Sequence, residues 1–245
     1  MNRGMTASAL EQWLRPAEVD PDASVRLLLF HYAGGGIGMY SQWPTLLPGD
    51  IGCQRVQLPG RHERHAEPAF TRLDPLLAEL TEVLADTADG RPYVLFGHSM
   101  GALLAYRLAV RQAESGRPGP ALIGVAGWAP AGFTGRTESI EDDLRAMPED
   151  LQDLVVPVLR ADAAVCASYD DDGAAVPCPV VAYGAAADPL LPAEALRSWA
   201  GRTPRFLGAR IYPGGHFFIR EHNAAIAADL VQLIRQHIVS EKEET

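Results

Sequence analysis

One serine lies in a setting that could make its hydroxyl a nucleophile. Residues 97–101 read Gly-His-Ser-Met-Gly, after the apolar segment 93–96 and before the helix-favouring stretch 102–109. The glycines two residues to either side of Ser99 remove side chains that would clash in a tight bend between a strand and a helix. The amide of Met100, at the helix N-terminus, can then face a developing oxyanion. The pattern predicts a nucleophilic Ser99, and the alternative is an ordinary structural turn.

A serine hydroxyl needs an imidazole to take its proton and a carboxylate to fix the tautomer of that imidazole. His216 follows the apolar run 208–212, and the glycines before it permit a bend that turns it back toward the serine. Asp188 follows the apolar run 179–184 in a loop of otherwise small, apolar residues. The cluster 170–172 is three adjacent aspartates, which is typical of a solvated loop. We therefore expect His216 to be the base and Asp188 the acid.

A second oxyanion donor should come from the loop that follows the first core strand. Residues 31–36 read His-Tyr-Ala-Gly-Gly-Gly, and the glycines would let the backbone approach a substrate carbonyl closely. We expect the amides of Ala33 and Met100 to form the oxyanion hole. The alternative is that the glycines form only a flexible turn. His98 adjoins the serine, and we expect a packing or hydrogen-bonding role for it.

These residues need elements that carry them to one place. Strand-like apolar runs occupy 26–31, 53–58, 93–96, 121–128, 179–184 and 208–212, and helical patterns occupy 73–88, 102–109, 191–201 and 223–238. Strands that alternate with helices predict an α/β fold with a mainly parallel sheet and helices on both faces. Residues 1–24 contain Pro16 and Pro21, which prevent a long helix, so we expect a surface arm there.

The interval 131–176 interrupts the alternation of strands and helices. It holds an acidic, helix-favouring sequence over 138–147, 149–160 and 161–169, with no strand-like run. A long insertion between core strands is often functional, for example as a lid over an active site. We predict a helical lid at 131–176 inserted in a single domain that spans 1–245, and the alternative is a peripheral helical decoration.

Composition narrows the possible partners and location. The chain has 245 residues, 47% hydrophobic residues and a net charge of −10, which suits one well-cored domain and argues against binding to nucleic acid or anionic membranes. It shows neither an apolar run of about 20 residues, as a membrane span needs, nor a signal-peptide pattern, so we expect a soluble, cytoplasmic protein. We also expect a monomer. Cys53, Cys166 and Cys178 lack a metal-binding spacing, and we expect reduced, partly buried thiols.

In combination these segments resemble the type II thioesterases that accompany polyketide and nonribosomal peptide synthases. The segments that carry the resemblance are Phe30–Gly36, Leu58–Arg61 with Arg64, Gly97–Gly101, Pro157–Asp162, Cys178–Val180, Asp188–Pro189 and Gly214–Phe218. The resemblance implies an α/β-hydrolase fold and hydrolysis of an acyl thioester from the phosphopantetheine arm of an acyl or peptidyl carrier protein, for editing or product release. It implies no metal or redox cofactor, and it implies that the lid is mobile and shapes an acyl pocket.

Carrier proteins are usually acidic, and so is this chain. Arg61, His62, Arg64 and His65 concentrate positive charge in the loop after the second core strand, so Arg61 and Arg64 are candidates for carrier docking. The alternative is that both arginines pair with local carboxylates and brace the loop.

Two other functions are compatible with the same residues. The triad chemistry is indifferent to an oxygen or a sulfur leaving group, so a small-molecule carboxylesterase of the same fold is one of them. The other is a non-catalytic ligand receptor on a hydrolase scaffold, since a fold alone does not determine function.

Overall fold

A central sheet organises the chain. The computed structural model describes residues 7–131 and 149–239. Within them the sheet has seven strands in the order β1-β3-β2-β4-β5-β6-β7, all parallel except β1, which pairs antiparallel with β3. The strands are β1 (Leu14–Arg15), β2 (Val25–Phe30), β3 (Ile51–Val56), β4 (Tyr93–His98), β5 (Leu122–Ala126), β6 (Val180–Ala185) and β7 (Phe206–Tyr212). The six strands predicted from apolar runs are confirmed, with bounds that differ by at most two residues.

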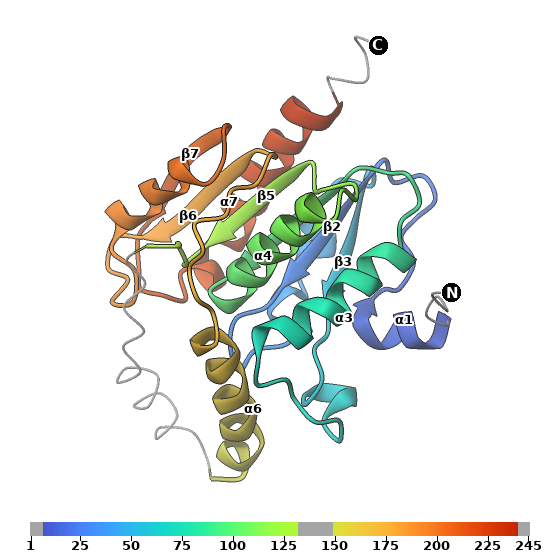
Figure 1. Cartoon of the computed structure of the whole chain (residues 1–245), viewed down its shortest axis with the longest axis vertical. Coiled ribbons are helices and arrows are strands. Elements are labelled where there is room, and N and C mark those ends of the chain that lie inside the picture. The colour runs from blue at the N-terminus through green and yellow to red at the C-terminus, as the bar shows by residue number, and fades with distance from the viewer. Residues whose placement is uncertain (1–6, 132–148, 240–245) are drawn as a thin grey trace.

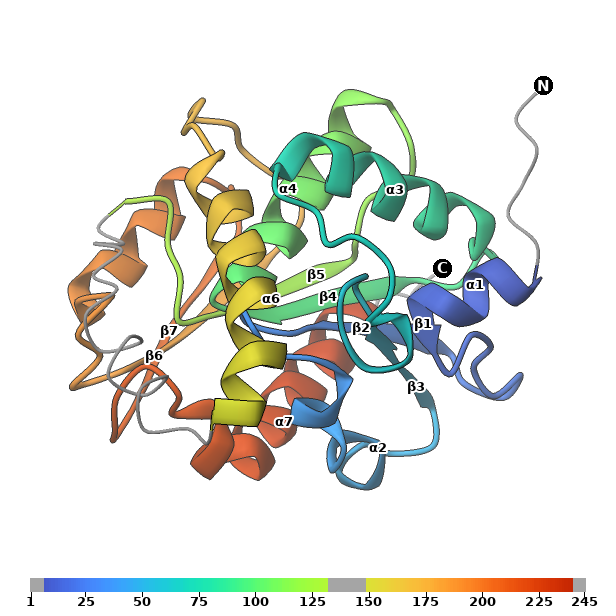
Figure 2. The same ribbon diagram turned by 90° about the horizontal axis from the view of Figure 1, so that it is seen from below.

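Helices cover both faces of the sheet. Figure 1 shows α3 and α4 in front of the sheet and α7 behind it, and Figure 2 shows the same two layers above and below the strands. The α-helices are α1 (Ala7–Trp13), α2 (Trp43–Leu46), α3 (Leu73–Asp86), α4 (Met100–Glu114), α6 (Glu149–Ala167) and α7 (Ile219–Ile234). The 3₁₀ helices are η1 (Ile37–Tyr40), η2 (His62–Arg64) and η3 (Ala193–Gly201), and η4 (Arg235–Val239) is a π-helical turn. The segment near 191–201 is thus helical as predicted, with 3₁₀ geometry.

The burial of strand β2 shows that the sheet lies at the centre of the core. All six of its residues are buried, because helices cover the sheet on both sides. Leu28 and Phe30 belong to the apolar cluster that includes α3 and α4, whereas Leu27 and Leu29 belong to the cluster that includes α7. This alternation follows from the period of two along a strand.

The N-terminal segment differs from the expected surface arm. Its described part forms α1 and then β1, which pairs with Arg55 and Val56 at the edge of the sheet. Trp13 and Leu14 are 5% and 0% exposed, so their apolar side chains fill this edge of the core. The prolines do keep the helix short, but burial of these two side chains attaches the segment to β3.

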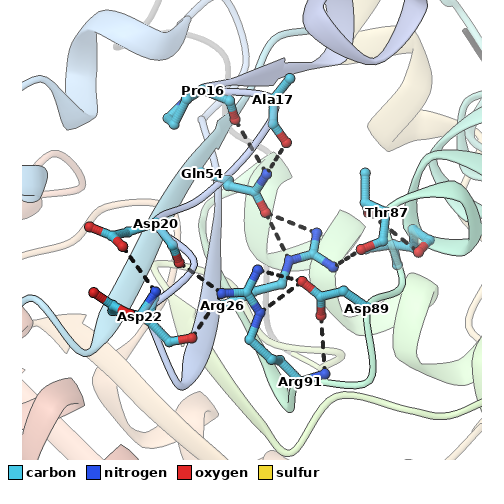
Figure 3. A network of polar contacts seen from close by, with 11 residues as sticks. Pro16, Ala17, Asp20, Asp22, Arg26, Gln54, Thr87, Asp89 and Arg91 are labelled. Atoms are coloured by element: carbon cyan, nitrogen blue, oxygen red, sulfur yellow. Dashed lines mark hydrogen bonds and ion pairs between the residues drawn. The ribbon is translucent and has the colours of Figure 1, made fainter. Parts of the chain in front are cut away.

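A buried polar network further attaches this segment at the amino ends of the strands (Figure 3). Arg26, only 3% exposed, donates from Nε and Nη2 to Gln54 Oε1 at 3.1 and 2.9 Å. Gln54 Nε2 in turn donates to the carbonyl of Ala17 at 2.7 Å. Nearby, Arg91 pairs with Asp89. The network lies at the edge of the sheet opposite to the carboxyl end of β4, where Ser99 follows.

The interval between β5 and β6 contributes one described helix. Helix α6 continues through Pro157, so the helical patterns at 149–160 and 161–169 form one element. Val165 and Val176 are 0% and 1% exposed and belong to the core cluster of α3 and α4. The C-terminal part of the interval is therefore packed on the body of the protein. The expected helix at 138–147 lies outside the described residues.

The three cysteines are unpaired thiols, as the sequence predicts. Burial raises the pKa of Cys53 to about 11 and those of Cys166 and Cys178 to about 12. These thiols are therefore protonated at neutral pH and poorly nucleophilic. Among the described helices, none has the length and apolarity needed to cross a bilayer.

Candidate active site

The turn between β4 and α4 holds Ser99 in an unusual backbone conformation. Its φ is 54° and its ψ is −118°, a region that costs a non-glycine residue on the order of 1–3 kcal/mol. A Cβ on Gly97 would lie 2.1 Å from the carbonyl carbon of Gly101, and a Cβ on Gly101 would lie 2.1 Å from the carbonyl oxygen of Phe30. Both contacts are with backbone, so only glycine fits. The turn predicted from the glycine spacing is confirmed, and its tightness explains the spacing.

The structure brings the three predicted triad residues together. Ser99 Oγ donates to His216 Nε2 at 3.0 Å, and His216 Nδ1 donates to Asp188 Oδ2 at 2.9 Å. We place the imidazole proton on Nδ1 because an ionised carboxylate can only accept. His216 follows β7 and Asp188 follows β6, so both reach Ser99 from the carboxyl edge of the sheet. Each of the three residues is at most 8% exposed.

Backbone amides hold the carboxylate of Asp188 in place. Its Oδ1 accepts from the amides of Leu190 at 2.8 Å and Leu191 at 3.3 Å, which leaves Oδ2 for His216. The aspartates of 170–172 are exposed, and two of them form ion pairs, Asp171 with Arg202 and Asp172 with Arg107. Their solvated position agrees with the sequence analysis, and Asp188 is the carboxylate that contacts the imidazole.

The two predicted oxyanion donors lie in adjacent elements. Met100 is the first residue of α4, where an amide has no intrahelical acceptor. Ala33 is in the loop after β2. The beginning of this loop touches the first turn of α4, since a Cβ on Gly101 would lie 2.8 Å from the carbonyl oxygen of His31. The two amides therefore belong to segments that pack against each other beside Ser99.

Two buried histidines near the triad are neutral at physiological pH. The His98 ring, 0% exposed, lies 5.1 Å from the His216 ring between centroids, and desolvation, followed by the charge of His216, holds its pKa well below the usual range. His31 donates from Nδ1 to the carbonyl of Tyr32 at 2.9 Å, and desolvation, followed by the charge of Arg61, lowers its pKa to about 4. As expected, His98 packs beside the triad rather than forming part of it.

The pKa of His31 predicts a loss of stability in mild acid. The unfolded chain takes up a proton on this residue below about pH 6.5, and the folded chain does so only near pH 4, so lowering the pH through this window favours unfolding. We expect the free energy of unfolding to be about 2 kcal/mol lower at pH 5 than at pH 7.5 from this residue alone. Urea unfolding at both pH values measures the difference. The variant His31→Asn is the control, and an equal pH difference in the two proteins would contradict the prediction.

Arg61 and Arg64 do not form the exposed basic patch on which the expectation of carrier docking is based. They are only 7% and 6% exposed. Arg61 forms a two-bonded ion pair with Asp162, at 2.7 and 2.8 Å. Arg64 pairs with Glu67 at 2.6 Å and lies 4.3 Å above the centroid of the Trp13 ring. Both cations are thus paired within the protein: Arg64 pairs with a local carboxylate, as the alternative states, whereas the partner of Arg61 lies in α6.

Asp162 is the residue whose part in this site the sequence analysis missed. Its carboxylate, 2% exposed, also accepts from the amide of Gly34 at 2.8 Å, in the loop that carries Ala33. It stands in α6, far along the chain from both partners. Asp162 is the single carboxylate among the apolar positions of 155–166, and this pattern could have indicated a buried, paired carboxylate. The sequence does not say which cation it pairs with.

Comparisons with known proteins point to thioesterases. A family model described as a thioesterase domain matches residues 25–234. The gramicidin S biosynthesis protein GrsT of Aneurinibacillus migulanus is 31% identical over 232 residues, which cover 87% of this chain and 90% of that protein.

Two solved structures share the fold at similar identity. The RedJ thioesterase from the prodiginine pathway of Streptomyces coelicolor is 33% identical with a TM-score of 0.78, covering 86% of this chain and 90% of that one. The type II thioesterase BorB from the borrelidin biosynthetic cluster is 30% identical with a TM-score of 0.79, covering 91% and 97%. The α/β-hydrolase fold is thereby confirmed, and the chain belongs to the thioesterase domain family.

Proposed function

We propose that this protein hydrolyses acyl thioesters held on the phosphopantetheine arm of an acyl or peptidyl carrier protein, in polyketide or nonribosomal peptide biosynthesis, for editing or product release. The observation that carries the proposal is the hydrogen-bonded series from Ser99 Oγ through His216 to Asp188. Membership of the thioesterase domain family supports a thioester as the bond that is cleaved. Relatives described as thioesterases of such pathways support the carrier-bound substrate.

In the first half of the reaction, Ser99 Oγ attacks the thioester carbonyl carbon while its proton moves to His216 Nε2. The negative charge that develops on the carbonyl oxygen is stabilised by the amides of Ala33 and Met100. Asp188 stabilises the imidazolium and holds its tautomer. The carbon–sulfur bond then breaks, His216 returns the proton to the sulfur, and the thiol of the arm leaves an acyl group on Ser99.

In the second half, water takes the place of the thiol. His216 accepts a proton from the water, whose oxygen attacks the acyl-enzyme carbonyl, and the same two amides stabilise the second oxyanion. Collapse releases a carboxylic acid and restores the Ser99 hydroxyl. The net reaction consumes one water and yields an acid and a thiol, and the side chains of this chain supply every proton transfer.

The proposal is tested by measuring hydrolysis of three substrates that carry the same acyl group on different leaving groups. We expect kcat/KM to be highest for the acyl-carrier protein, lower for the same acyl group on free pantetheine, and lowest for an aryl ester. A faster aryl ester with no preference for the carrier would favour a carboxylesterase. A fluorophosphonate probe that fails to label Ser99 would favour a non-catalytic receptor. Mass spectrometry of the acyl-carrier substrates gives the rate directly.

A further inference from the structure

Helix α6 contacts the loop after β2 through a buried, charged side chain. Asp162 Oδ2 accepts from both the Gly34 amide and Arg61 Nη1, at 2.8 and 2.7 Å, and its Oδ1 accepts from Arg61 Nη2 at 2.8 Å. Both oxygens of the carboxylate are therefore occupied. Arg61 Nη1 also donates to the carbonyl of Gly35 at 3.2 Å. The Arg61–Asp162 ion pair thus holds the amide of Gly34 and the carbonyl of Gly35.

The same stretch of α6 packs directly on this loop. Gly34 has a φ of +72°, and a Cβ on it would lie 3.1 Å from Leu159 Cδ1. Leu159 and Asp162 lie three residues apart, on neighbouring positions of the helix surface. The apolar contact and the polar contact therefore meet the loop at the same residue. Figure 2 shows α6 crossing in front of the carboxyl ends of the central strands, where this loop emerges.

A purely stabilising role does not account for this pair. Burying two charges costs several kcal/mol per ion, and well-packed apolar residues often serve stability equally well. What apolar residues cannot supply is an acceptor for the Gly34 amide. That amide belongs to the peptide unit that follows Ala33, so holding it restricts rotation of the backbone at Ala33. The geometry thus relates Asp162 to the orientation of the Ala33 amide.

We propose that Asp162 is a positioning residue for the reaction: its carboxylate fixes the Gly34 peptide and so aims the Ala33 amide at the oxyanion, and Arg61 fixes the carboxylate. The inference rests on the proposed function, in which Ala33 is an oxyanion donor. Asp162 does not touch the substrate. It acts through the backbone of the loop, so its removal should lower the rate of the chemical step and leave substrate binding largely unchanged.

Two matched double variants separate the effect of the hydrogen-bond acceptor for Gly34 from the effect of the two charges. Arg61→Met with Asp162→Asn removes both charges and keeps an oxygen that can accept from Gly34. Arg61→Met with Asp162→Leu removes both charges and the acceptor, with a side chain of similar size. We expect kcat on an acyl-pantetheine substrate to be about ten- to a hundredfold lower in the Leu variant than in the Asn variant, with KM values within about threefold of each other. Active-site titration with a fluorophosphonate normalises kcat to folded enzyme.

A second readout separates positioning from structural support. A trifluoromethyl ketone forms a tetrahedral oxyanion on Ser99. Its affinity should therefore be lower for the Leu variant than for the Asn variant, by the same factor as kcat. The single variant Glu67→Gln, which changes the neighbouring Arg64 pair, should leave both quantities close to the native values. Equal kcat and equal ketone affinity in the Asn and Leu variants would overturn the inference, even if their thermal unfolding temperatures differ.

Arg61→Lys provides a further measurement in which the pair of charges is kept. Lysine cannot form the two-bonded arrangement of the guanidinium. We expect a lower kcat and a weaker ketone complex with little change in KM, and native values of both would contradict the inference.

The ketone also separates this inference from the proposed function. It adds to Ser99 whatever the natural leaving group is. A ketone affinity that follows the Gly34 acceptor in a protein that does not hydrolyse acyl-carrier substrates would support the positioning role and refute the proposed substrate. Hydrolysis of acyl-carrier substrates, with no difference between the double variants, would support the proposed substrate and refute the positioning role.

Discussion

The variant Ser99→Ala is expected to lose nearly all turnover, with kcat lower by roughly 10⁵- to 10⁶-fold, as when the nucleophile is removed from other serine hydrolases. Without Oγ no acyl-enzyme forms, and His216 has no hydroxyl to deprotonate. The loss should be as large on a small soluble thioester as on an acyl-carrier substrate, because the missing atom acts in the chemical step. Steady-state hydrolysis of both substrates measures it.

The fold should persist in this variant, because alanine keeps the Cβ and the turn is determined by the close contacts of Gly97 and Gly101. A circular dichroism melt checks this point. Ser115→Ala is a matched control, since Ser115 Oγ donates only to the Gln112 carbonyl at the other end of α4. That variant should keep native kcat. Hydrolysis by Ser99→Ala within a hundredfold of the native rate would show that Ser99 is not the nucleophile.

The variant Asp188→Asn is expected to lower kcat about 10⁴-fold, as the same change does in the serine-protease template. The side-chain oxygen of asparagine would stay with the Leu190 and Leu191 amides, which need an acceptor. The amide nitrogen would then face His216 Nδ1 and donate to it. His216 would have to carry its proton on Nε2, where it can no longer accept from Ser99.

The pH profile of kcat and fluorophosphonate labelling of Ser99 measure this effect, and both should show a weakened nucleophile in a folded protein. Asp229→Asn is the matched control. Asp229 accepts from the Tyr183 hydroxyl at 2.9 Å and pairs with Arg210, so it is another partly buried carboxylate in a polar contact, outside the triad. Loss of activity in Asp229→Asn equal to that in Asp188→Asn would indicate a general effect of lost carboxylates.

The triad could be predicted from the sequence because each member is marked by local features. Ser99 is flanked by glycines between a strand-like run and a helical pattern, and His216 and Asp188 each follow an apolar run of strand length. In a parallel sheet all strands end at the same edge, so three residues that directly follow strands lie on the same side of the sheet. The strand order and the loops then decide that they meet. The mainly parallel sheet itself followed from the alternation of apolar runs and helical patterns.

The roles of the charged side chains could not be predicted in the same way. Arg61 and Arg64 stand in a segment rich in basic residues and suggested an exposed patch, yet both are buried against carboxylates. Asp162, the partner of Arg61, is 101 residues away in the chain. The edge strand formed by Leu14 and Arg15 is too short to have a sequence period, and it exists because β3 offers a free edge.

The amino-acid sequence by itself determined which side chains could do the chemistry and on which side of the sheet they stand, because turn geometry and hydrophobic period are local properties. Only the tertiary structure decided which charges meet: Asp162 attaches α6 to the loop after β2, and Arg61 is buried against it. The physical reason is that an ion pair between distant segments has no local signature. It forms where packing brings the two segments together and excludes water.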